Sequence, residues 1–595
     1  MSPSHSCHVL AGDLDIRLAE APAGFRVDLA AVEVEHGLHH VTLELTAGSP
    51  LTPPPIKLAW SLPIVEIKAV WYPGCNARRW LTRPWEISVH SAVTRHAPVV
   101  SLYDIGCENR FTFACSDALN PVESTASVHE ETATFSCHLI FFDRPSAPVK
   151  TYRAILRLDR RRKPYFECLQ EVRQWWATMP GMAPAPVPEA ALQPVYSTWY
   201  SFHQELTDRK VEAQCRLAKE LGCELVILDD GWQTSDNTRG YAFCGDWEPC
   251  PEKFPDMAAH VSRVHVLGMK SMLWFSVPFI GPNTAAYLRF QGKYLFHMDR
   301  LQASVLDPRY PDVREYLIGL YERAVRDWGF DGLKLDFVDQ FSMPEESDGD
   351  TAPGRDILSG PEAADRLLHD TRVRLSRINP DVLIEFRQSY VGPRMRNYGN
   401  LFRASDCPAD ALCNRVRIVD VRLIAGDTAA HSDMIMWSTE EPVESAALQF
   451  LNVLFSVPQI SVKLDAIPPD HLEMLRFWMG FWKRLRPVLM AGKFEPYYPE
   501  LHYPFILAKT SDTWVGACYA DIAAPLVGPL PAEIYLVNAT SRPRLILETG
   551  GPAATYQIDS LSVLGKQTGS RKLTLEPDVH ALEVPRSGLL HLKRT

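Results

Sequence analysis

The pattern of hydrophobic and polar positions changes twice along the chain and divides it into three regions. Up to about residue 175, short runs alternate apolar and polar positions or are rich in β-branched and aromatic residues; examples are 41–45, 111–115 and 133–137. Such runs, separated by Pro, Gly and Asn, predict the strands of a β-sandwich. Five prolines between positions 180 and 194 predict a linker after it.

From about residue 195 to 485 the pattern becomes strand, loop, helix. Continuous apolar runs predict eight buried strands, at 195–199, 224–228, 269–275, 332–335, 382–386, 401–404, 421–425 and 459–464. One helix between them is predicted to start at the cap residue Thr207 and to end at Gly222, and another to run from Pro311 to Gly329. Eight strands that alternate with helices predict a parallel closed (β/α)₈ barrel.

Beyond residue 487 the pattern returns to short strands, at 505–507, 514–518, 533–537 and 545–548. We therefore expect an α/β multidomain protein. Its predicted parts are an N-terminal β-sandwich (1–180), a Pro-rich linker (181–194), a catalytic TIM barrel (195–487) and a C-terminal antiparallel β-sheet domain (488–595).

Composition narrows the classes of function. The net charge is −11 without a Lys/Arg-rich block, which argues against nucleic acid as the main partner. No apolar stretch approaches the roughly 18–20 residues that cross a bilayer, so we expect no membrane partner. The first 17 residues lack the order of a signal peptide, and the 13 cysteines are scattered without a CxxC pair. We expect reduced thiols and a cytoplasmic location.

Carboxylates stand at the ends of three predicted strands. Asp229 and Asp230 follow the second strand, Asp336 ends the fourth, and Asp406 follows the sixth. An unpaired carboxylate at the edge of a core is costly to desolvate, so an apolar strand has no reason of its own to end in Asp. In a barrel, however, the strands open at their C-termini into the active site. A cage of carboxylates suits sugar hydroxyls and the chemistry of glycosidic bonds.

Lys334 and Asp336 are two positions apart, so both side chains point to the same face of the fourth strand. A lysine beside an aspartate keeps the carboxylate ionised, as a nucleophile requires. The alternative is a structural salt bridge at the end of the barrel.

Asp406 is the candidate general acid. The negative charge of Asp336 across the site would raise the pKa of Asp406, which is what a general acid requires. Alternatively, Asp406 caps the helix that Pro408 begins. Asp410 is a rival acid, although we expect it within the first helical turn.

Asp229 and Asp230 repel each other, so both need donors, and two neighbouring hydroxyls of a pyranose would supply them. The alternative is that one of them caps a loop. Tryptophans near the strand ends could stack on sugar faces or pack inside the protein; they are Trp199, Trp232, Trp247 and Trp274. We find no phosphate loop and no convincing spacing of metal ligands, so no cofactor and no metal is expected.

Several motifs in the region 195–485 carry a resemblance. They are Leu-Asp-Asp-Gly-Trp at 228–232, Gly-Asp-Trp at 245–247, Pro-Glu-Lys-Phe-Pro at 251–255, Leu-Gly-Met-Lys at 267–270, Leu-Trp-Phe at 273–275 and Lys-Leu-Asp at 334–336. In order and spacing they resemble the alpha-galactosidases of glycoside hydrolase family 36. The flanking β domains also fit the three-domain plan of that family.

The resemblance implies a role for each matching residue. Asp336 would be the nucleophile and Asp406 the acid/base in a double displacement with retention, which requires carboxyl groups roughly 5–5.5 Å apart. Asp229 and Asp230 would bind the C4 and C6 hydroxyls, Lys334 and Arg403 would contact the sugar and the neighbourhood of the nucleophile, Trp199 would form part of the pocket wall, and Trp247 would close it from a loop. The substrate-binding residues expected in all are Asp229, Asp230, Trp199, Trp247, Trp274, Lys334, Arg387, Gln388 and Arg403. The implied partner is an oligosaccharide or glycoside, and a homo-oligomer is expected.

The chain departs from the family in two places. Typical members carry a Cys-Ser-Gly-Gly-like segment after the fifth strand, in the region that reads the C2 substituent, where this chain has Glu-Phe-Arg-Gln-Ser-Tyr at 385–390. Residues 337–339 are Phe-Val-Asp where Met-Asn-Arg is usual. Arg387 or Gln388 could therefore select another sugar, such as β-L-arabinopyranose or a 2-substituted galactose such as N-acetylgalactosamine.

The alternatives to an exo-acting alpha-galactosidase are the same mechanism on another glycoside, including an α-glucoside, and a transglycosylase like raffinose synthase. A further alternative is a carbohydrate-binding protein without catalysis, although both candidate carboxylates are present.

Overall fold

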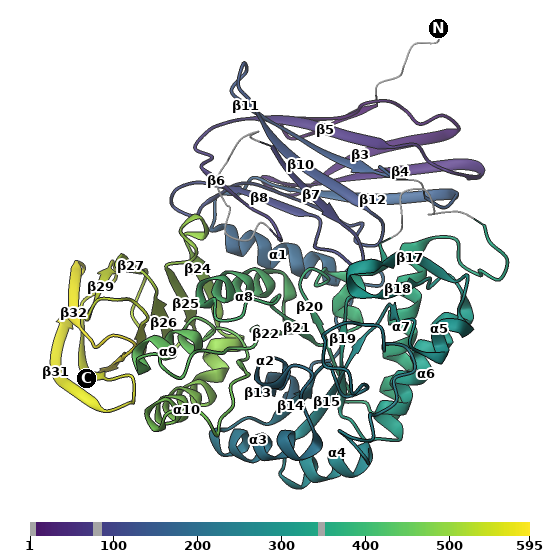
Figure 1. Cartoon of the computed structure of the whole chain (residues 1–595). Helices are drawn as coiled ribbons and strands as arrows, with labels where there is room; N and C mark the ends of the chain where they lie inside the picture. The colour runs from purple at the N-terminus through teal and green to yellow at the C-terminus, as the bar shows by residue number, and fades with distance from the viewer. Residues whose placement is uncertain (1–6, 75–85, 145, 343–350) are drawn as a thin grey trace.

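The computed structural model of the chain describes residues 7–74, 86–144, 146–342 and 351–595. A β-sandwich lies against one side of a central barrel, and a second β domain packs beside the barrel at the C-terminus (Figure 1). Cys75 lies outside the described residues. The twelve described cysteines are free thiols. No helix among the described residues has the length and apolar character needed to cross a bilayer.

The N-terminal domain consists of two six-stranded antiparallel sheets. The first contains, in spatial order, β1 (His8–Ala11), β2 (Leu14–Leu18), β5 (Ile56–Pro63), β11 (Thr134–Phe141), β10 (Val122–His129) and β7 (Glu86–Ser91). The second contains β3 (Phe25–Glu35), β4 (Leu38–Leu51), β12 (Val149–Asp159), β9 (Asn109–Cys115), β8 (Val99–Tyr103) and β6 (Ala69–Trp71). Alternate positions of β5 are buried, as its sequence pattern requires, and they meet the opposite sheet in one apolar cluster.

One helix lies within the region predicted to be β-rich. Helix α1 (Tyr165–Ala177) follows Pro164 and carries buried residues at helical spacing, among them Phe166, Leu169, Val172 and Trp176. These residues join the apolar cluster of the barrel rather than that of the sandwich. The helix packs on the barrel helix α8 (Ala411–Ala425), so it couples the two domains.

The central domain is a parallel eight-stranded sheet that closes on itself. Its strands are, in spatial order, β22 (Ala429–His431), β21 (Leu401–Arg403), β20 (Leu383–Arg387), β19 (Gly332–Asp336), β15 (Lys270–Ser276), β14 (Leu225–Leu228), β13 (Val195–Ser197) and β23 (Gln459–Ile460). Hydrogen bonds from Val457 N to Ala430 O (2.8 Å) and from Ser432 N to Val457 O (3.0 Å) bring the two edge strands together. The predicted TIM barrel is confirmed.

Seven of the eight predicted strands overlap observed ones, but the strand predicted at 421–425 is wrong. Those residues form the last turns of α8, and the strand follows them at Ala429–His431. Residues 416, 418, 419, 421 and 423–425 are all buried apolar positions. A short apolar run of this kind fits a buried helix as well as a buried strand.

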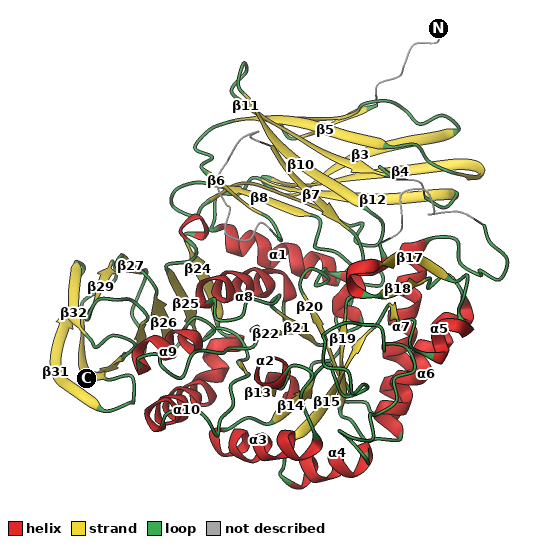
Figure 2. Cartoon of the chain, viewed as in Figure 1, coloured by secondary structure: helices red, strands yellow, loops and turns green. Residues whose placement is uncertain are grey.

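Helices surround the barrel strands (Figure 2). Besides α8 they are α2 (Trp199–Phe202), α3 (Asp208–Leu221), α4 (Met257–Val266), α5 (Ala285–Arg289), α6 (Pro311–Arg326), α7 (Gly360–Ile378), α9 (Val443–Leu451) and α10 (Pro469–Ala491). The predicted ends of α3 are confirmed: the Thr207 side chain accepts from Lys210 N, and Gly222 takes the left-handed conformation (φ 101°). Short 3₁₀ turns also occur, namely η1 (Glu189–Leu192), η2 (Asp299–Leu301), η3 (Val338–Phe341), η4 (Arg394–Asn397) and η5 (Pro499–Leu501). A small sheet of β16 (Phe279–Ile280), β17 (Tyr294–Met298) and β18 (Ala303–Leu306) is inserted between β15 and α6.

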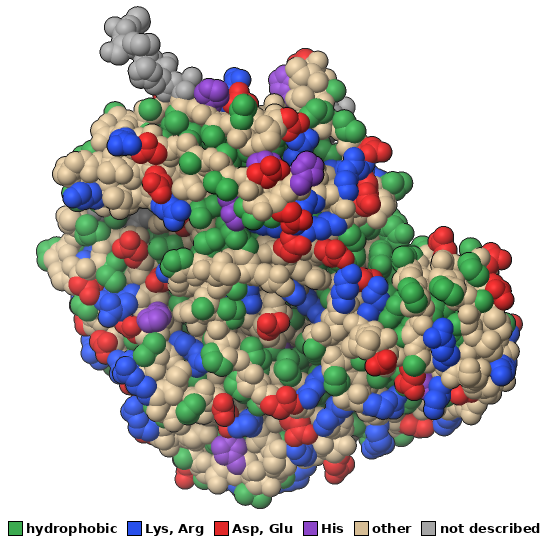
Figure 3. Space-filling model, turned by 180° about the vertical axis from the view of Figure 1, so that it is seen from behind, with side chains coloured by type: hydrophobic (Ala, Val, Ile, Leu, Met, Phe, Trp, Pro, Cys, Tyr) green, Lys and Arg blue, Asp and Glu red, His purple; other side chains and the backbone are tan. Residues whose placement is uncertain are grey.

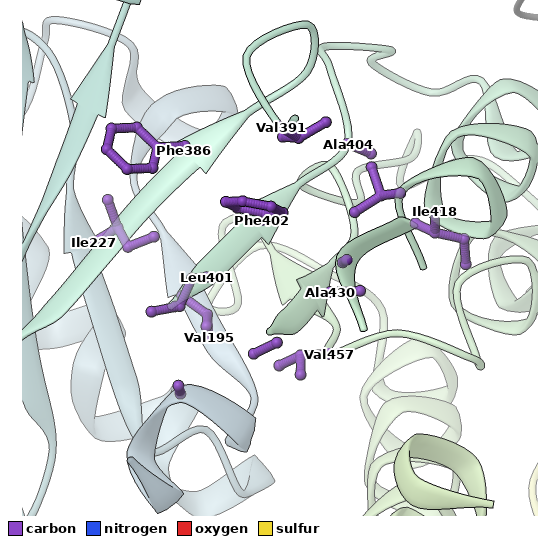
Figure 4. Close-up of a cluster of buried hydrophobic side chains, with 14 of the residues drawn as sticks. Val195, Ile227, Phe386, Val391, Leu401, Phe402, Ala404, Ile418, Ala430 and Val457 are labelled. Atoms are coloured by element: carbon purple, nitrogen blue, oxygen red, sulfur yellow. The ribbon is translucent and has the colours of Figure 1, made fainter. Parts of the chain in front are cut away.

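Apolar side chains from neighbouring strands fill the barrel. Figure 4 shows Val195, Ile227 and Leu401 with Phe402 and Ala430, which come from β13, β14, β21 and β22. All five are essentially inaccessible to solvent. Because Leu401 and Phe402 are consecutive in β21, they point to opposite faces of the strand, so apolar packing lies on both faces of the barrel sheet.

The C-terminal domain contains a seven-stranded and a three-stranded sheet. The larger consists of β24 (Lys493–Tyr497), β25 (Phe505–Lys509), β26 (Thr513–Cys518), β28 (Glu533–Asn538), β33 (Leu589–Arg594), β30 (Ala554–Leu561) and β31 (Gln567–Leu575). The smaller consists of β27 (Ala523–Leu526), β29 (Arg544–Thr549) and β32 (Val579–Glu583). Most pairings are antiparallel as predicted, but β26 pairs with β28 and β27 with β29 in parallel.

A buried hydrogen-bond junction joins the three domains. Trp71 of the sandwich donates from Nε1 to Oδ1 of Asp420 in α8 (3.0 Å) and to the hydroxyl of Tyr503 beside the C-terminal sheet (3.1 Å). The Tyr503 hydroxyl in turn donates to Asp420 (2.7 Å). One indole therefore satisfies a buried carboxylate and ties together elements from all three domains.

The substitution Trp71→Phe keeps an aromatic ring but removes this donor. We expect it to lower the free energy of unfolding by about 1–3 kcal/mol, because the buried Asp420 carboxylate loses a hydrogen bond. Urea denaturation measures the change. Trp60→Phe is the matched control, since Nε1 of the buried Trp60 has no hydrogen-bond partner among the described residues. An equal loss in both variants would show that the junction contributes only packing.

Candidate active site

Polar side chains from four strands meet at the C-terminal end of the barrel. Asp229 and Asp230 follow β14, Asp336 is the last residue of β19, Arg387 ends β20 and Arg403 ends β21. The parallel sheet places these ends at one rim, which is where active sites of such barrels lie.

The Asp336 carboxylate is held by four donors. Its Oδ1 accepts from Arg387 Nε (2.7 Å), the Tyr390 hydroxyl (2.6 Å) and Phe337 N (2.8 Å), and its Oδ2 accepts from Trp274 Nε1 (3.1 Å). Three donors on Oδ1 fix the orientation of the carboxylate, whereas Oδ2 has a single partner. Oδ2 is therefore the oxygen better placed to react.

The charges around Asp336 keep it ionised. Burial alone would raise its pKa, but the positive charges of Arg387 and Lys334 and the hydrogen bond from Tyr390 outweigh burial and hold the pKa of Asp336 well below its ordinary value. An ionised carboxylate in a buried position suits a nucleophile.

Lys334 and Asp336 do not pair directly. The Lys334 ammonium donates to Asp229 Oδ2 (2.6 Å), and both side chains are almost fully buried. The backbone N–H of Asp229 donates to the Thr198 hydroxyl (2.9 Å). Lys334 therefore acts on Asp336 through its charge and on Asp229 through contact. Lys334 and Asp336 therefore do not form the plain salt bridge that the sequence left open. Lys334 helps to keep Asp336 ionised through its charge, while its direct partner is Asp229.

Asp230 is buried between two amides. Gln204 Nε2 donates to its Oδ2 and Gln233 Nε2 to its Oδ1, each at 2.8 Å. Burial raises the pKa of Asp230 to about 6, although these two hydrogen bonds oppose the rise. The paired carboxylates thus find protein donors, Lys334 for Asp229 and two glutamines for Asp230. Neither carboxylate accepts from a backbone N–H two or three residues ahead, as a loop cap would.

Asp406 is the most exposed carboxylate of the group, with 48% of its side chain accessible against 8% for Asp336. Arg403 donates to its Oδ1 (2.9 Å). The expected rise of its pKa is wrong for the free site. Burial and Asp336 would raise the pKa of Asp406, but Arg403, with help from Arg387 and Lys334, lowers it. The sequence alone does not show that the Arg403 guanidinium affects the pKa of Asp406 more strongly than the charge of Asp336 does.

Helix α8 is capped by Asp410, not by Asp406. The Asp410 side chain accepts from Cys413 N (2.9 Å), and the helix begins at Ala411. This removes the helix-cap interpretation of Asp406, and it gives Asp410 a structural task instead of a place in the site. Pro408 lies in the loop before the helix.

Arg403 is the centre of a network that sequence reasoning missed in part. Its buried guanidinium pairs with Asp406, with Asp433 just beyond β22, and with Glu385 in β20 at 3.5 Å. Asp433 also accepts from Cys407 N (2.6 Å) and from the Tyr200 hydroxyl (2.9 Å). Like the carboxylates recognised from the sequence, Asp433 stands at the end of a barrel strand; the misplaced seventh strand concealed it.

Gln388 supports the loop that carries Asp406. Its Oε1 accepts from Ser405 N (3.1 Å), and its own N–H donates to Arg403 O (3.0 Å). Gln388 thus has its acceptor engaged by protein, whereas Arg387 lies against the nucleophile. In the segment expected to differ from the family, Arg387 therefore contacts Asp336, and Gln388 contacts the residue that precedes Asp406.

The tryptophans occupy different layers. Trp274 touches the nucleophile, and Trp199 is half-buried at the start of α2, next to His203 (ring centroids 4.8 Å apart). Trp247 is only 2% exposed and stacks on Trp232 (5.7 Å) while it contacts Trp274 from behind (5.8 Å). Trp247 therefore supports the wall of the site from within the core. It is too deeply buried to close the pocket from a loop, as the resemblance implied.

Among the described residues, the one group with the spacing of metal ligands is His90, Glu123 and Asp143 of the sandwich, away from the strand ends. The rim of the barrel instead combines carboxylates with cations that pair with them. Such a site can bind a neutral polyol through charged hydrogen bonds. It can also supply one ionised carboxylate as a nucleophile and a second, more exposed carboxylate for proton transfer.

A barrel with these features belongs to the TIM-barrel class whose strand ends carry paired carboxylates, the class that includes retaining glycosidases. The sequence profile of the melibiase family matches residues 189–357, which include Asp229, Asp230 and Asp336. The chain is thus similar to the melibiase family over the segment that carries these three carboxylates.

Curated relatives match about a third of the chain or less. Alpha-galactosidase 2 of Pediococcus pentosaceus is 28% identical over 203 residues, which are 32% of this chain and 27% of that protein. An A type blood alpha-D-galactosamine galactosaminidase of Flavonifractor plautii is 27% identical over 184 residues, 27% of this chain and 16% of that protein. The chain thus spans about a quarter or less of the length of these relatives.

Solved structures share the whole fold. An alpha-galactosidase from Lactobacillus brevis aligns with 100% of this chain and 83% of its own, with a TM-score of 0.66 and 18% identity. The GH36 alpha-galactosidase AgaA from Geobacillus stearothermophilus, solved with 1-deoxygalactonojirimycin, aligns with 99% of this chain and 84% of its own, with a TM-score of 0.66 and 16% identity. The three-domain architecture is therefore that of these proteins.

The raised pKa of Asp230 predicts a pH-dependent stability. The folded protein holds the proton on Asp230 up to about pH 6, whereas the unfolded chain releases it near its ordinary value of 3.8. Stability therefore falls as the pH rises from 4 to 6, because ionised Asp230 is buried. In Asp230→Asn this loss is absent. Relative to the unmodified protein, we expect the variant to gain about 2–3 kcal/mol of unfolding free energy between pH 4 and pH 7, measured by urea denaturation. A difference between the two proteins that stays constant with pH would contradict the assignment.

Proposed function

We propose that the protein is a retaining, exo-acting glycoside hydrolase that removes terminal α-D-galactosyl residues from oligosaccharides. The observation that carries the proposal is the pair of carboxylates at the rim. Asp336 is ionised and held by four donors, and the partly exposed Asp406 accepts a hydrogen bond from Arg403. The names of the relatives, alpha-galactosidases among them, support the choice of sugar.

In the proposed first step, Oδ2 of Asp336 attacks the anomeric carbon while Asp406 protonates the leaving oxygen. This gives a covalent glycosyl-enzyme. In the free site Arg403 favours the ionised form of Asp406. A bound sugar would displace water from this exposed carboxylate and so raise its pKa toward the protonated form that the first step requires.

In the second step, ionised Asp406 takes a proton from water, which attacks the anomeric carbon and releases Asp336. Arg403 supports this step because it stabilises Asp406 as a carboxylate until the proton arrives. Arg387 and Tyr390 would stabilise the charge that returns to Asp336 as the ester bond breaks.

Asp229 and Asp230 would bind hydroxyls on the far side of the ring. Each still has acceptor capacity after its contacts with Lys334, Gln204 and Gln233. Buried charged acceptors discriminate strongly against sugars that lack the matching hydroxyl, because the carboxylate would then lose a partner.

A second candidate is the same mechanism on another sugar, and Arg387 favours it. Its guanidinium bonds the nucleophile and lies over the rings of Phe337 (5.2 Å) and Tyr390 (5.6 Å), in the segment that the family resemblance assigns to the C2 substituent. Release of p-nitrophenol from the α-galactoside, α-glucoside, α-N-acetylgalactosaminide and β-L-arabinopyranoside distinguishes the two candidates. The α-galactoside should be cleaved fastest. Cleavage of another member alone would move the assignment to that sugar.

The nucleophile is tested by Asp336→Ala. We expect the variant to lose about 10⁴-fold or more of kcat on p-nitrophenyl α-galactoside, because the covalent step is gone. Added azide should restore turnover and give β-galactosyl azide, detectable by NMR. The control is Asp331→Asn. Asp331 stands just before β19, at the end of the strand opposite Asp336, and pairs with Lys270 (2.8 Å). This variant should keep the activity. An azide product of α configuration would rule out the assigned role.

Asp406→Ala tests the acid/base. With an oligosaccharide, whose leaving alcohol needs a proton, kcat/KM should fall by about 10²–10⁴-fold, whereas p-nitrophenol leaves without one and its formation should fall far less. The matched control is Asp410→Asn, four residues along, which weakens the cap of α8 by no more than about 1 kcal/mol and should leave both rates unchanged. Equal losses on the two substrates in Asp406→Ala would argue against proton transfer by Asp406.

A further inference from the structure

A cavity of about 340 Å³ lies where the sandwich meets the barrel. The sandwich contributes residues 90–96, Pro121 and Arg144; the barrel contributes 339–342 of η3 and the segment after it, Ser389 after β20, and two residues of α7. The junction itself is tight, since His96 N donates to Ser389 O at 2.7 Å. The space thus lies at the contact between the two domains, which lie against each other in Figure 1.

The barrel wall of this cavity continues directly from the catalytic rim. Asp339 lies three residues after Asp336, and Ser389 stands between Gln388 and Tyr390, whose hydroxyl bonds Asp336. The pKa of Asp339 responds to the charges of Arg387 and Asp336, which places the cavity within electrostatic reach of the nucleophile. The cavity therefore lies beside the two segments that hold Asp336.

The charges in the cavity are not paired with each other. Arg95 and Arg144 are exposed and form no ion pair with any described residue. Asp339 is the carboxylate among the described lining residues, and its buried Oδ1 has no hydrogen-bond partner among the residues described. Burial, with Arg95 beside it, lowers the pKa of His96 to about 4, so His96 is neutral at pH 7. Within the described part of the chain, both guanidiniums are thus without an ion pair and one carboxylate oxygen of Asp339 is without a hydrogen bond.

On the face drawn in Figure 3, acidic and basic side chains alternate without a large patch of one sign. Arginines near the catalytic rim have partners, as Arg403 and Arg387 do. Arg95 and Arg144 differ from these two rim arginines, because neither forms an ion pair with a described residue.

We propose that this cavity is the subsite for the leaving group, and that it selects leaving groups that carry both hydroxyls and an anionic group, such as a uronate or a phosphorylated sugar. Arg95 and Arg144 would bind the anion, for which the guanidinium fork is suited, and Asp339 would accept from a hydroxyl. The inference rests on the proposed glycoside hydrolase function and adds the chemistry of its second substrate position.

The test compares 4-carboxyphenyl α-galactoside with its neutral analogue, 4-carbamoylphenyl α-galactoside. The ratio of their kcat/KM values is measured in the unmodified protein and in Arg95→Met/Arg144→Met. Intrinsic leaving-group reactivity is the same for both proteins, so the change in the ratio isolates recognition of the charge. We expect the double variant to lose about tenfold of the preference for the carboxylate, and added salt to reduce the preference in the unmodified protein alone.

Three further variants sharpen the result. Asp339→Asn removes the negative charge of the cavity and should shift the ratio in the opposite direction, toward the carboxylate. Arg209→Met, an exposed arginine on α3, is the matched control and should leave the ratio unchanged. Arg95→Lys keeps the charge and should keep most of the preference. A phosphate in place of the carboxylate then shows which anion is preferred.

The outcomes separate the two proposals. Cleavage of both galactosides with a ratio that no cavity variant alters would overturn the leaving-group assignment and leave the hydrolase function intact. Absence of any cleavage by the folded protein would overturn both. A change in the ratio in opposite directions for the arginine variants and Asp339→Asn would support the cavity as the subsite, since a fold defect would lower both rates together.

Discussion

The Arg403 guanidinium is the interaction on which the site depends. It is buried at the end of β21, where an unpaired charge would be prohibitively costly, and it is neutralised by carboxylates from three other segments, Glu385, Asp406 and Asp433. Because each partner sits on a different strand or loop, the charge balance fixes the relative positions of β20, β21 and β22. Removal of one partner would leave the others misplaced as well as unbalanced.

A second layer of polar contacts holds the nucleophile in the same way. Arg387 ends β20 and Tyr390 lies in the loop after it, and both reach Oδ1 of Asp336, while the indole of Trp274 approaches the other oxygen. Trp247 and Trp232 stack behind Trp274 and restrict its ring. The geometry of the reactive carboxylate thus depends on an aromatic core as much as on charge.

Much of this arrangement can be predicted from the sequence, because it follows from local rules. Apolar runs that end in Asp revealed β14, β19 and the loop after β21, and the cap residues Thr207 and Gly222 fixed α3 to the residue. What failed depends on contacts between distant segments. The apolar end of α8 fits a buried strand equally well, so the sequence predicts neither β22 nor the position of Asp433 just beyond it. The pKa of Asp406 could not be judged without knowing that Arg403 touches it, and the burial of Trp247 follows from tertiary stacking alone.

The apolar cluster of the barrel does not stop at the barrel. It includes Trp71 and Tyr103 from the sandwich, Trp176 from α1, and Tyr503 and Ile506 from the C-terminal domain. Three domains that share one core have no hinge plane between them, since any rotation would open a dry apolar interface. The chain should therefore behave as a single cooperative block, in which substrate enters through side-chain and loop movement at the rim. A barrel separated from the other two domains would expose the apolar faces that they cover. The three domains look separate in the fold, but they should not be stable independently of one another.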